Sequence, residues 1–216
     1  MEIYMIILIA GEKGGSGKSC LAQNLSVYLQ AKGRDIILLD GDPQETTLMW
    51  SKARLENPQV ESILTMGVSG KIYETIQDLN KRYQDVIIDC GGHDNETMRS
   101  CLVSATHLLI PFRPKRRDLG TIGGMQELVA TAKIYNPILE VRAVITQCPT
   151  APNQVGRILE SKDLCKAFEI TPLNAVTFNR NIYDDAEENG YSVFETGSDL
   201  KARAEITEIA QEFLGI

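Results

Sequence analysis

The chain of 216 residues lacks the features that mark several large classes of protein. No apolar run approaches the roughly 18 residues of a membrane span. The first apolar stretch, Ile3–Ala10, is short and has no basic region before it, so it does not resemble a signal peptide. The five cysteines are odd in number and include no Cys-x-x-Cys pair, so they indicate no disulfide or zinc framework. We expect a cytoplasmic protein with reduced thiols.

Positive charge is also scarce, because 22 Lys and Arg residues stand against 29 Asp and Glu residues and leave a net charge of −7. This balance argues against a protein that coats nucleic acid with its whole surface, although a local basic patch remains compatible with it. The chain has no repeat, low-complexity tract or linker-like segment, and its 43% hydrophobic residues can fill a complete core. One domain over residues 1–216 is the expected organisation.

Short apolar segments alternate with helical patterns, which predicts an α/β domain with a doubly wound, mostly parallel sheet between helices. The expected strands are Ile3–Ala10, Asp35–Asp40, Val60–Thr65, Asp85–Asp89, His107–Pro111, Val141–Thr146 and Asn174–Thr177. The expected helices are Lys18–Ala31, Thr46–Leu55, Ser69–Arg82, Glu96–Ala105, Leu119–Tyr135, Gln154–Phe168, Tyr183–Asn189 and Leu200–Leu214. Ligands of such sheets bind beyond the carboxyl ends of the strands, so functional residues should lie there.

A glycine-rich loop follows the first strand and opens a helical pattern. Residues 11–19 read Gly-Glu-Lys-Gly-Gly-Ser-Gly-Lys-Ser. The glycines allow successive backbone N–H groups to converge on phosphate oxygens, Lys18 can reach the β- and γ-phosphates, and the Ser19 hydroxyl can bind Mg²⁺. The loop predicts a nucleotide site on a P-loop NTPase fold. The expected nucleotide-binding residues are Lys13, Gly14, Gly15, Ser16, Gly17, Lys18, Ser19 and Cys20.

Two positions of this loop depart from the standard pattern. Lys13 is a second lysine at a position where the pattern requires no charge. Glu12 occupies the position of the usual opening glycine and brings negative charge close to an anion site.

Carboxylates follow two of the expected strands. Asp40 and Asp42 come at the end of the second strand, and Asp89 ends the fourth strand before the glycine turn that closes at Gly92. Phosphoryl transfer depends on positioning and charge neutralisation, so it needs a lysine, Mg²⁺ and a group that orients water. We expect Ser19, Asp40 and Asp89 at the metal, with Asp89 as the Walker B residue, and Asp42 as the group that orients water.

Together, the string from Lys13 to Ser19, the Asp-Gly-Asp-Pro-Gln string at residues 40–44 and the Asp-Cys-Gly-Gly string at 89–92 resemble the three nucleotide motifs of the ParA/MinD superfamily of deviant Walker A ATPases. The strings at residues 47–52 and 191–195 further resemble the small ParF-type plasmid-partition ATPases. These relatives lack an N-terminal operator-binding domain, and the expected first strand at residue 3 leaves no room for one here.

The resemblance implies roles for individual residues. Lys13 is similar to the signature lysine that reaches the partner's phosphates in a nucleotide sandwich dimer, so Lys13, Lys18 and Asp42 are the expected catalytic residues, with ATP and Mg²⁺ as cofactors. Cys20 stands where the family commonly has threonine, which removes a hydroxyl near the α-phosphate.

The resemblance also implies a DNA surface, because family dimers that form with ATP hold DNA without sequence preference. Arg180 matches a family arginine of this kind, and Lys201 and Arg203 fall where relatives place basic residues. Residues 115–117 (Lys-Arg-Arg) are a second candidate, for which a solvated loop is an equally good interpretation. Phosphate contacts need charge alone, so a few cations doubled by dimer symmetry can suffice.

The resulting hypothesis is a nucleoid-associated DNA-segregation ATPase, which forms a homodimer with ATP and is stimulated by a centromere-binding, ParB-like adaptor. A MinD-like regulator that cycles on a membrane is the first alternative, but Glu205, Glu208 and Glu212 on the expected polar face of the last helix should repel anionic lipid. A nitrogenase-type iron protein needs cluster cysteines that we do not find. A dethiobiotin-synthetase-like ligase lacks a lysine like Lys13. The cargo, whether plasmid, carboxysome or chemoreceptor cluster, stays open.

Overall fold

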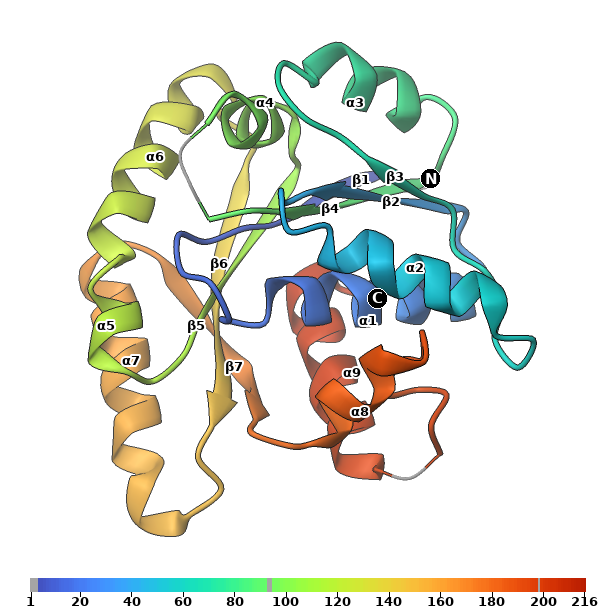
Figure 1. Ribbon diagram of the computed structural model, residues 1–216. Coiled ribbons are helices and arrows are strands. Elements are labelled where there is room, and N and C mark those ends of the chain that lie inside the picture. Colours follow the sequence, from blue (N-terminus) through green and yellow to red (C-terminus); the bar gives the residue numbers. More distant parts are fainter. Residues whose placement is uncertain (1–3, 93–94, 198) are drawn as a thin grey trace.

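A parallel sheet forms the centre of the computed structural model, which describes residues 4–92, 95–197 and 199–216 (Figure 1). Its strands are β1 (Met5–Ile9), β2 (Ile36–Gly41), β3 (Thr65–Gly67), β4 (Asp85–Cys90), β5 (His107–Phe112), β6 (Glu140–Cys148) and β7 (Thr171–Phe178). The seven strands of the described chain lie in the order β3-β2-β4-β1-β5-β6-β7, and each of their pairings is parallel. The predicted α/β class is therefore confirmed, and the sheet is parallel throughout these pairings.

Helices cover both faces of the sheet, as Figure 1 shows. They are α1 (Lys18–Ala31), α2 (Thr46–Glu56), α3 (Tyr73–Asn80), α4 (Glu96–Ser104), α5 (Arg116–Leu119), α6 (Ile122–Tyr135), α7 (Val155–Ala167), α8 (Ile182–Glu188) and α9 (Leu200–Leu214), with a 3₁₀ turn at Pro152–Gln154. One hydrophobic core joins the sheet to α1, α2 and α9, and a second joins it to α3, α4, α6 and α7. Two complete cores explain why the central strands are apolar on both faces.

Strand β1 illustrates this double burial. Ile6 and Leu8 point into one core and Ile7 and Ile9 into the other, and all four are at most 3% exposed. Because neighbouring strands are parallel and in register, with Asp89 opposite both Asp40 and Ile9, the segments that follow β1, β2 and β4 leave the sheet at the same edge. The three sequence motifs therefore lie together.

The third strand was predicted in the wrong place. The expectation was residues 60–65, whereas β3 is Thr65–Gly67 and, among the described strands, pairs with β2 alone. The apolar pattern before it has another origin: Ile63 is buried in the α1 core, and the Ser62 carbonyl accepts a hydrogen bond from Gln30 of α1. Packing against a helix, not strand pairing, produced that pattern.

The helix expected at residues 119–135 is divided in the structure. The short helix α5 starts at Arg116, and Gly120 and Thr121 separate it from α6. Residues 115–117 are thus the start of a helix and not a plain solvated loop. The expected helix at residues 69–82 is shorter, since α3 begins at Tyr73. Residue 3 of the expected first strand lies outside the described residues.

Candidate nucleotide site

The glycine-rich loop between β1 and α1 adopts a shape that side chains would hinder. Gly15 and Gly17 have φ values of 72° and 90°, a region that glycine enters without strain. The Ser16 hydroxyl and the Lys18 ammonium both donate to the Lys13 carbonyl, each at 3.1 Å. The loop therefore curls around Lys18, the first residue of α1, which is only 6% exposed.

The two loop lysines have different surroundings. Lys18 lies inside the curl, whereas the Lys13 side chain is exposed and makes no hydrogen bond or ion pair with the described part of the chain. Glu12 turns away from the anion site, because a Cβ added at Gly124 of α6 would lie 2.2 Å from its Oε1. The Glu12 carboxylate therefore lies against α6, and its negative charge does not point toward the predicted phosphate site.

Three polar contacts from other strands hold the loop, and sequence reasoning missed all of them. The Thr146 hydroxyl donates to the Ser16 carbonyl at 2.7 Å, and the Gln147 amide donates to the Gly15 carbonyl at 2.9 Å. Arg113, after β5, approaches the Gly14 carbonyl at 3.4 Å while it pairs with the buried Asp118 at 2.5 Å. Thr146 and Gln147 lie near the carboxyl end of β6 and Arg113 directly follows β5, so position at this edge of the sheet was the signal that could have found them.

Asp40, in β2, and Asp42, just after it, have different surroundings. Asp40 is 2% exposed, and its two oxygens accept the backbone N–H groups of Asp42 at 3.0 Å and Leu48 at 2.8 Å. Asp40 thus shapes the loop into α2, and backbone N–H groups already engage both of its oxygens, which disfavours it as a metal ligand. The Asp42 carboxylate lies against the glycine turn after β4, because a Cβ at Gly91 would meet it at 3.1 Å.

Asp89 at the end of β4 is fully buried and incompletely hydrogen-bonded. Its Oδ2 accepts the Thr47 hydroxyl at 2.7 Å, whereas its Oδ1 has no hydrogen-bond partner among the described residues. Burial raises the pKa of Asp89 to about 6, and the hydroxyls of Ser19 and Thr47 oppose this rise. A buried carboxylate oxygen without a partner, beside a serine hydroxyl, fits a hard cation such as Mg²⁺.

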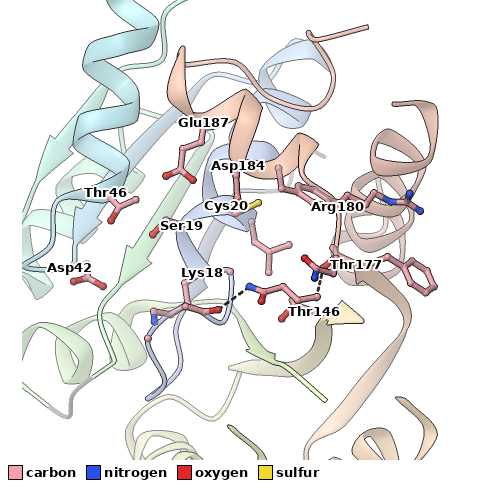
Figure 2. Close-up of a pocket in the computed structure, with 18 of the residues that line it drawn as sticks. Lys18, Ser19, Cys20, Asp42, Thr46, Thr146, Thr177, Arg180, Asp184 and Glu187 are labelled. Carbon is pink, nitrogen blue, oxygen red and sulfur yellow. Dashed lines mark hydrogen bonds between the residues drawn. The ribbon is translucent and has the colours of Figure 1, made fainter. Parts of the chain in front are cut away.

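A cavity of about 370 Å³ opens beside the loop and is large enough for a nucleotide (Figure 2). The loop residues form one side. The other side consists of the segment from β7 into α8, with Arg180, Tyr183, Asp184 and Glu187. Burial raises the pKa of the Cys20 thiol to about 12, and the charges of Glu187 and Asp184 add to this rise. Cys20 is therefore a neutral group at the cavity wall.

The three predicted DNA-binding residues lie near one another but differ in their pairing. Arg180 donates from Nε to the buried Glu205 at 2.7 Å and approaches Asp199, the N-cap of α9, at 3.8 Å. Its side chain is 20% exposed and lines the cavity. Lys201 and Arg203, in the first turn of α9, are exposed. Arg180 is thus neutralised by carboxylates. Lys201 and Arg203 remain as exposed cations on that surface, with the Arg203 guanidinium 5.9 Å from the centre of the Phe194 ring.

Glu205 also corrects the expected polar face of the last helix. This side chain is buried at 7% exposure and accepts hydrogen bonds from Arg180, from the Tyr183 hydroxyl at 2.8 Å and from the Phe178 N–H at 3.1 Å. Glu208 and Glu212 are exposed as expected. In the described ranges 4–92, 95–197 and 199–216 no helix is both long and apolar enough to cross a membrane.

A glycine-rich loop between a central parallel strand and a helix, with aspartates at the ends of two adjacent strands, defines a P-loop nucleotide-binding protein. The family model described as "CobQ/CobB/MinD/ParA nucleotide binding domain" matches residues 7–172. The chain belongs to this family, and the predicted ParA/MinD superfamily is confirmed. The narrower likeness to ParF-type proteins stays a prediction.

Two curated relatives are similar to this chain, one over about half of its length and the other over nearly all of it. Protein ParA of Rhizobium radiobacter is 32% identical over 126 residues, which cover 58% of this chain and 56% of that protein. The chain thus matches little more than half of the length of this relative. The maintenance of carboxysome distribution protein A of Halothiobacillus neapolitanus is 26% identical over 216 residues, which cover 96% of this chain and 95% of that protein.

Solved structures of low sequence identity share the fold. The ATP complex of a Cyanothece McdA variant has a TM-score of 0.79 at 15% identity and covers 100% of this chain and 98% of its own. The septum site-determining protein MinD of Pyrococcus horikoshii, complexed with Mg-ADP, has a TM-score of 0.74 at 18% identity, with coverage of 97% and 96%. Proteins with these folds include partition and positioning ATPases of the ParA/MinD type.

Proposed function

We propose that this protein is a Mg²⁺-dependent ATPase that forms a homodimer when it binds ATP and acts as a switch in DNA partition. In this proposal the loop residues Gly14–Cys20 hold the phosphates, Ser19 and Asp89 hold Mg²⁺, and Asp42 orients the attacking water. Mg²⁺ would neutralise charge that develops on the transferred phosphoryl group. The nucleotide-bound states of the structurally similar McdA and MinD proteins support the choice of ATP and Mg²⁺.

One observation carries the proposal: the Lys13 side chain is exposed and its ammonium makes no hydrogen bond or ion pair with the described chain, although it sits in a phosphate-binding loop. Lys18, whose ammonium lies inside the loop on the Lys13 carbonyl, is the lysine that would serve this chain's own phosphate site. An exposed cation at the rim of such a site suits the phosphates of a second copy, where it would stabilise transition-state charge as an arginine finger does. Lys13, Lys18 and Asp42 are then the catalytic residues.

Substitution of Lys13 tests the dimer. Lys13→Ala should bind ADP within about twofold of the wild type, because the protein's own phosphate contacts remain, yet it should lose ATP-dependent dimerisation and at least tenfold in ATP turnover. Light scattering with ATP and a phosphate-release assay measure the two effects. Lys133→Ala removes an exposed lysine from α6 and is the matched control. Normal dimerisation and turnover of Lys13→Ala would refute the proposed role.

DNA partition requires a DNA surface, and we place it on the exposed first turn of α9. Lys201→Glu with Arg203→Glu should reduce ATP-dependent binding to nonspecific duplex, and each lost phosphate contact should lower the slope of log affinity against log salt by about one. Arg180 is kept intact, since reversing it would also break its pairs with Glu205 and Asp199. A Lys115→Glu and Arg117→Glu protein is the matched control; if it alone loses DNA, the surface lies at α5.

The cargo and the adaptor form the finer part of the proposal. Plasmid DNA with a centromere-binding, ParB-like adaptor follows from the likeness to ParA, and association with the nucleoid in the cytoplasm follows from DNA binding. The nearly complete match to a carboxysome distribution protein favours, as a second candidate, a positioning ATPase for another cargo. A MinD-like regulator on membranes is less favoured, because Glu208 and Glu212 keep the exposed surface of the second half of α9 acidic. Liposome flotation with ATP tests the membrane function: ATP-dependent flotation would favour it over both kinds of cargo.

A further inference from the structure

Thr47 connects the proposed metal site to the helix that follows the second motif. It lies in the first turn of α2, is 0% exposed, and donates its hydroxyl to Asp89 Oδ2 at 2.7 Å. A carboxylate accepts hydrogen bonds and offers none, so the hydroxyl must be the donor. This bond occupies Oδ2 of Asp89. The other oxygen, Oδ1, has no hydrogen-bond partner among the described residues and stays available to a ligand.

A buried amide restricts the direction of the Thr47 hydroxyl. The Nε2 of Gln23, on α1, lies 3.5 Å from Thr47 Oγ1 and 3.4 Å from Glu187 Oε1 on α8. Gln23 is 2% exposed. Because the amide nitrogen can only donate, it faces the lone pairs of the threonine oxygen and favours donation of the hydroxyl proton toward Asp89. The line of contacts thus joins β4, α2, α1 and α8 beside the cavity.

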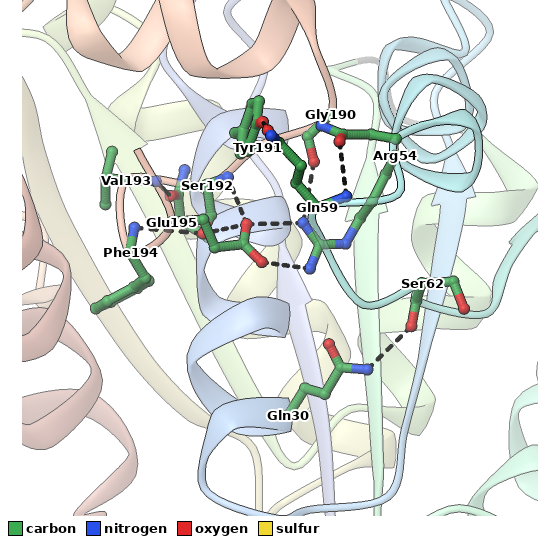
Figure 3. Close-up of polar contacts among 12 residues, drawn as sticks. Gln30, Arg54, Gln59, Ser62, Gly190, Tyr191, Ser192, Val193, Phe194 and Glu195 are labelled. Atoms are coloured by element: carbon green, nitrogen blue, oxygen red, sulfur yellow. Dashed lines mark hydrogen bonds and ion pairs between the residues drawn. The ribbon is translucent and has the colours of Figure 1, made fainter. Parts of the chain in front are cut away.

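Helix α2 is in turn held to the segment between α8 and α9. The Trp50 indole donates to the Tyr191 carbonyl at 2.9 Å. The guanidinium of Arg54, which is 1% exposed, donates to both oxygens of Glu195 at 2.7 and 2.8 Å and to the Gly190 carbonyl at 2.9 Å (Figure 3). A Cβ at Gly190 would lie 2.2 Å from the Arg54 backbone nitrogen, so the two segments are in close contact.

We propose that Thr47 is a positioning residue that orients Asp89 toward the cation and transmits occupation of the metal site to α2 and the 190–195 segment. The inference rests on the proposed function, because it takes Mg²⁺ and an adenine nucleotide as ligands of the site. Loss of a hydrogen bond to a metal-binding group typically costs 10- to 100-fold in metal affinity. Thr47 is also the residue of α2 that touches Asp89 directly, three positions before Trp50.

The test compares Thr47→Val, which keeps the shape and removes the hydroxyl, with Thr47→Ser, which keeps the hydroxyl. The chain has a single tryptophan, so the fluorescence of Trp50 reports on α2 itself. On titration of Mg²⁺ into the ADP-bound protein, Thr47→Val should need about tenfold more Mg²⁺ for half-saturation and should lose most of the Trp50 response. Thr47→Ser should stay within about twofold of the wild type. In steady-state turnover, the valine variant should lower kcat more than it raises KM for ATP.

Matched variants separate positioning from folding. Thr131→Val makes the same change on the exposed face of α6, where the hydroxyl donates to the Glu127 carbonyl. This variant should leave the half-saturating Mg²⁺ concentration and the Trp50 response unchanged. Gln23→Leu removes the orienting amide, keeps Thr47, and should raise the half-saturating Mg²⁺ concentration by about threefold; it serves as the test if Thr47→Val unfolds. A wild-type Mg²⁺ titration and Trp50 response in Thr47→Val, or in Gln23→Leu if Thr47→Val unfolds, would overturn the inference. Failure of the wild type to bind Mg-ADP would instead refute the proposed function.

Discussion

Strand β4 carries a buried aspartate at each end, and the two have opposite surroundings. Asp85 at the start of the strand is 0% exposed and pairs with Arg34, whose Nε and Nη2 each meet one carboxylate oxygen, the latter at 2.7 Å. Asp89 at the end is also 0% exposed, but Oδ1 has no partner among the described residues. Equal burial therefore accompanies unequal compensation of charge.

The difference follows from the direction of the sheet. The amino ends of parallel strands meet turns such as the one at Gly33, and Arg34, which follows that turn, pairs with Asp85. The carboxyl ends surround the nucleotide cavity, where the missing interactions of Asp89 would come from a ligand. The partner of a paired buried charge offsets the cost of removing that charge from water, whereas a buried charge left unpaired costs stability until its ligand binds. Buried aspartates in this fold are thus distinguished by their partners.

The largest expected effect is on the paired aspartate. Asp85→Asn leaves the Arg34 guanidinium beside a neutral amide, and breaking a buried ion pair in this way typically costs about 3 to 5 kcal/mol of unfolding free energy. Urea denaturation measures the loss. ADP binding by the folded fraction should be unchanged, because Asp85 lies at the opposite end of the strand from the cavity. A loss below about 1 kcal/mol would remove the distinction between the two aspartates.

Much of the fold could be predicted from the sequence, because local signals agreed with one another. The apolar runs around Ile7 and Ile87 are buried on both faces of the sheet. The glycine-rich loop lies between β1 and α1, and its glycines mark the end of the strand and the start of the helix. The strand at residues 60–65 was wrong because Ile63 is apolar for reasons of helix packing. A short edge strand that pairs on one side leaves little periodicity to read.

The candidate site was predictable where its residues are adjacent in sequence. Positions 13–19 and 40–42 follow from the motifs alone, whereas the contacts of Thr47 with Asp89 and of Thr146 with Ser16 join residues 42 and 130 positions apart. Nothing in the sequence pattern announces such pairs, since threonine serves equally well in a core, a cap or a turn. The same limit hid the carboxylates around Arg180, because Asp199 and Glu205 reach it only through the packing of α9.

Asp89 allows the finer prediction, because its unpaired charge should make stability depend on pH in an unusual direction. Its folded pKa of about 6 lies above the ordinary value of 3.8, so the folded state favours the protonated form. This difference in pKa contributes about 2 to 3 kcal/mol to the free energy of unfolding. The contribution is fully present below about pH 4 and is lost as the pH rises through about 6. Asp89→Asn removes the charge and should therefore be more stable than the wild type above pH 7, by up to that amount, in the absence of Mg²⁺ and nucleotide.

Thermal unfolding across pH 4 to 8 measures the stability of the two proteins, and the two curves should converge at low pH. Addition of Mg²⁺ and ADP should stabilise the wild type more than the variant, which keeps the phosphate loop and lacks the metal-binding carboxylate. Equal stability of both proteins at pH 8 without ligand would show that the charge of Asp89 is already compensated within the fold.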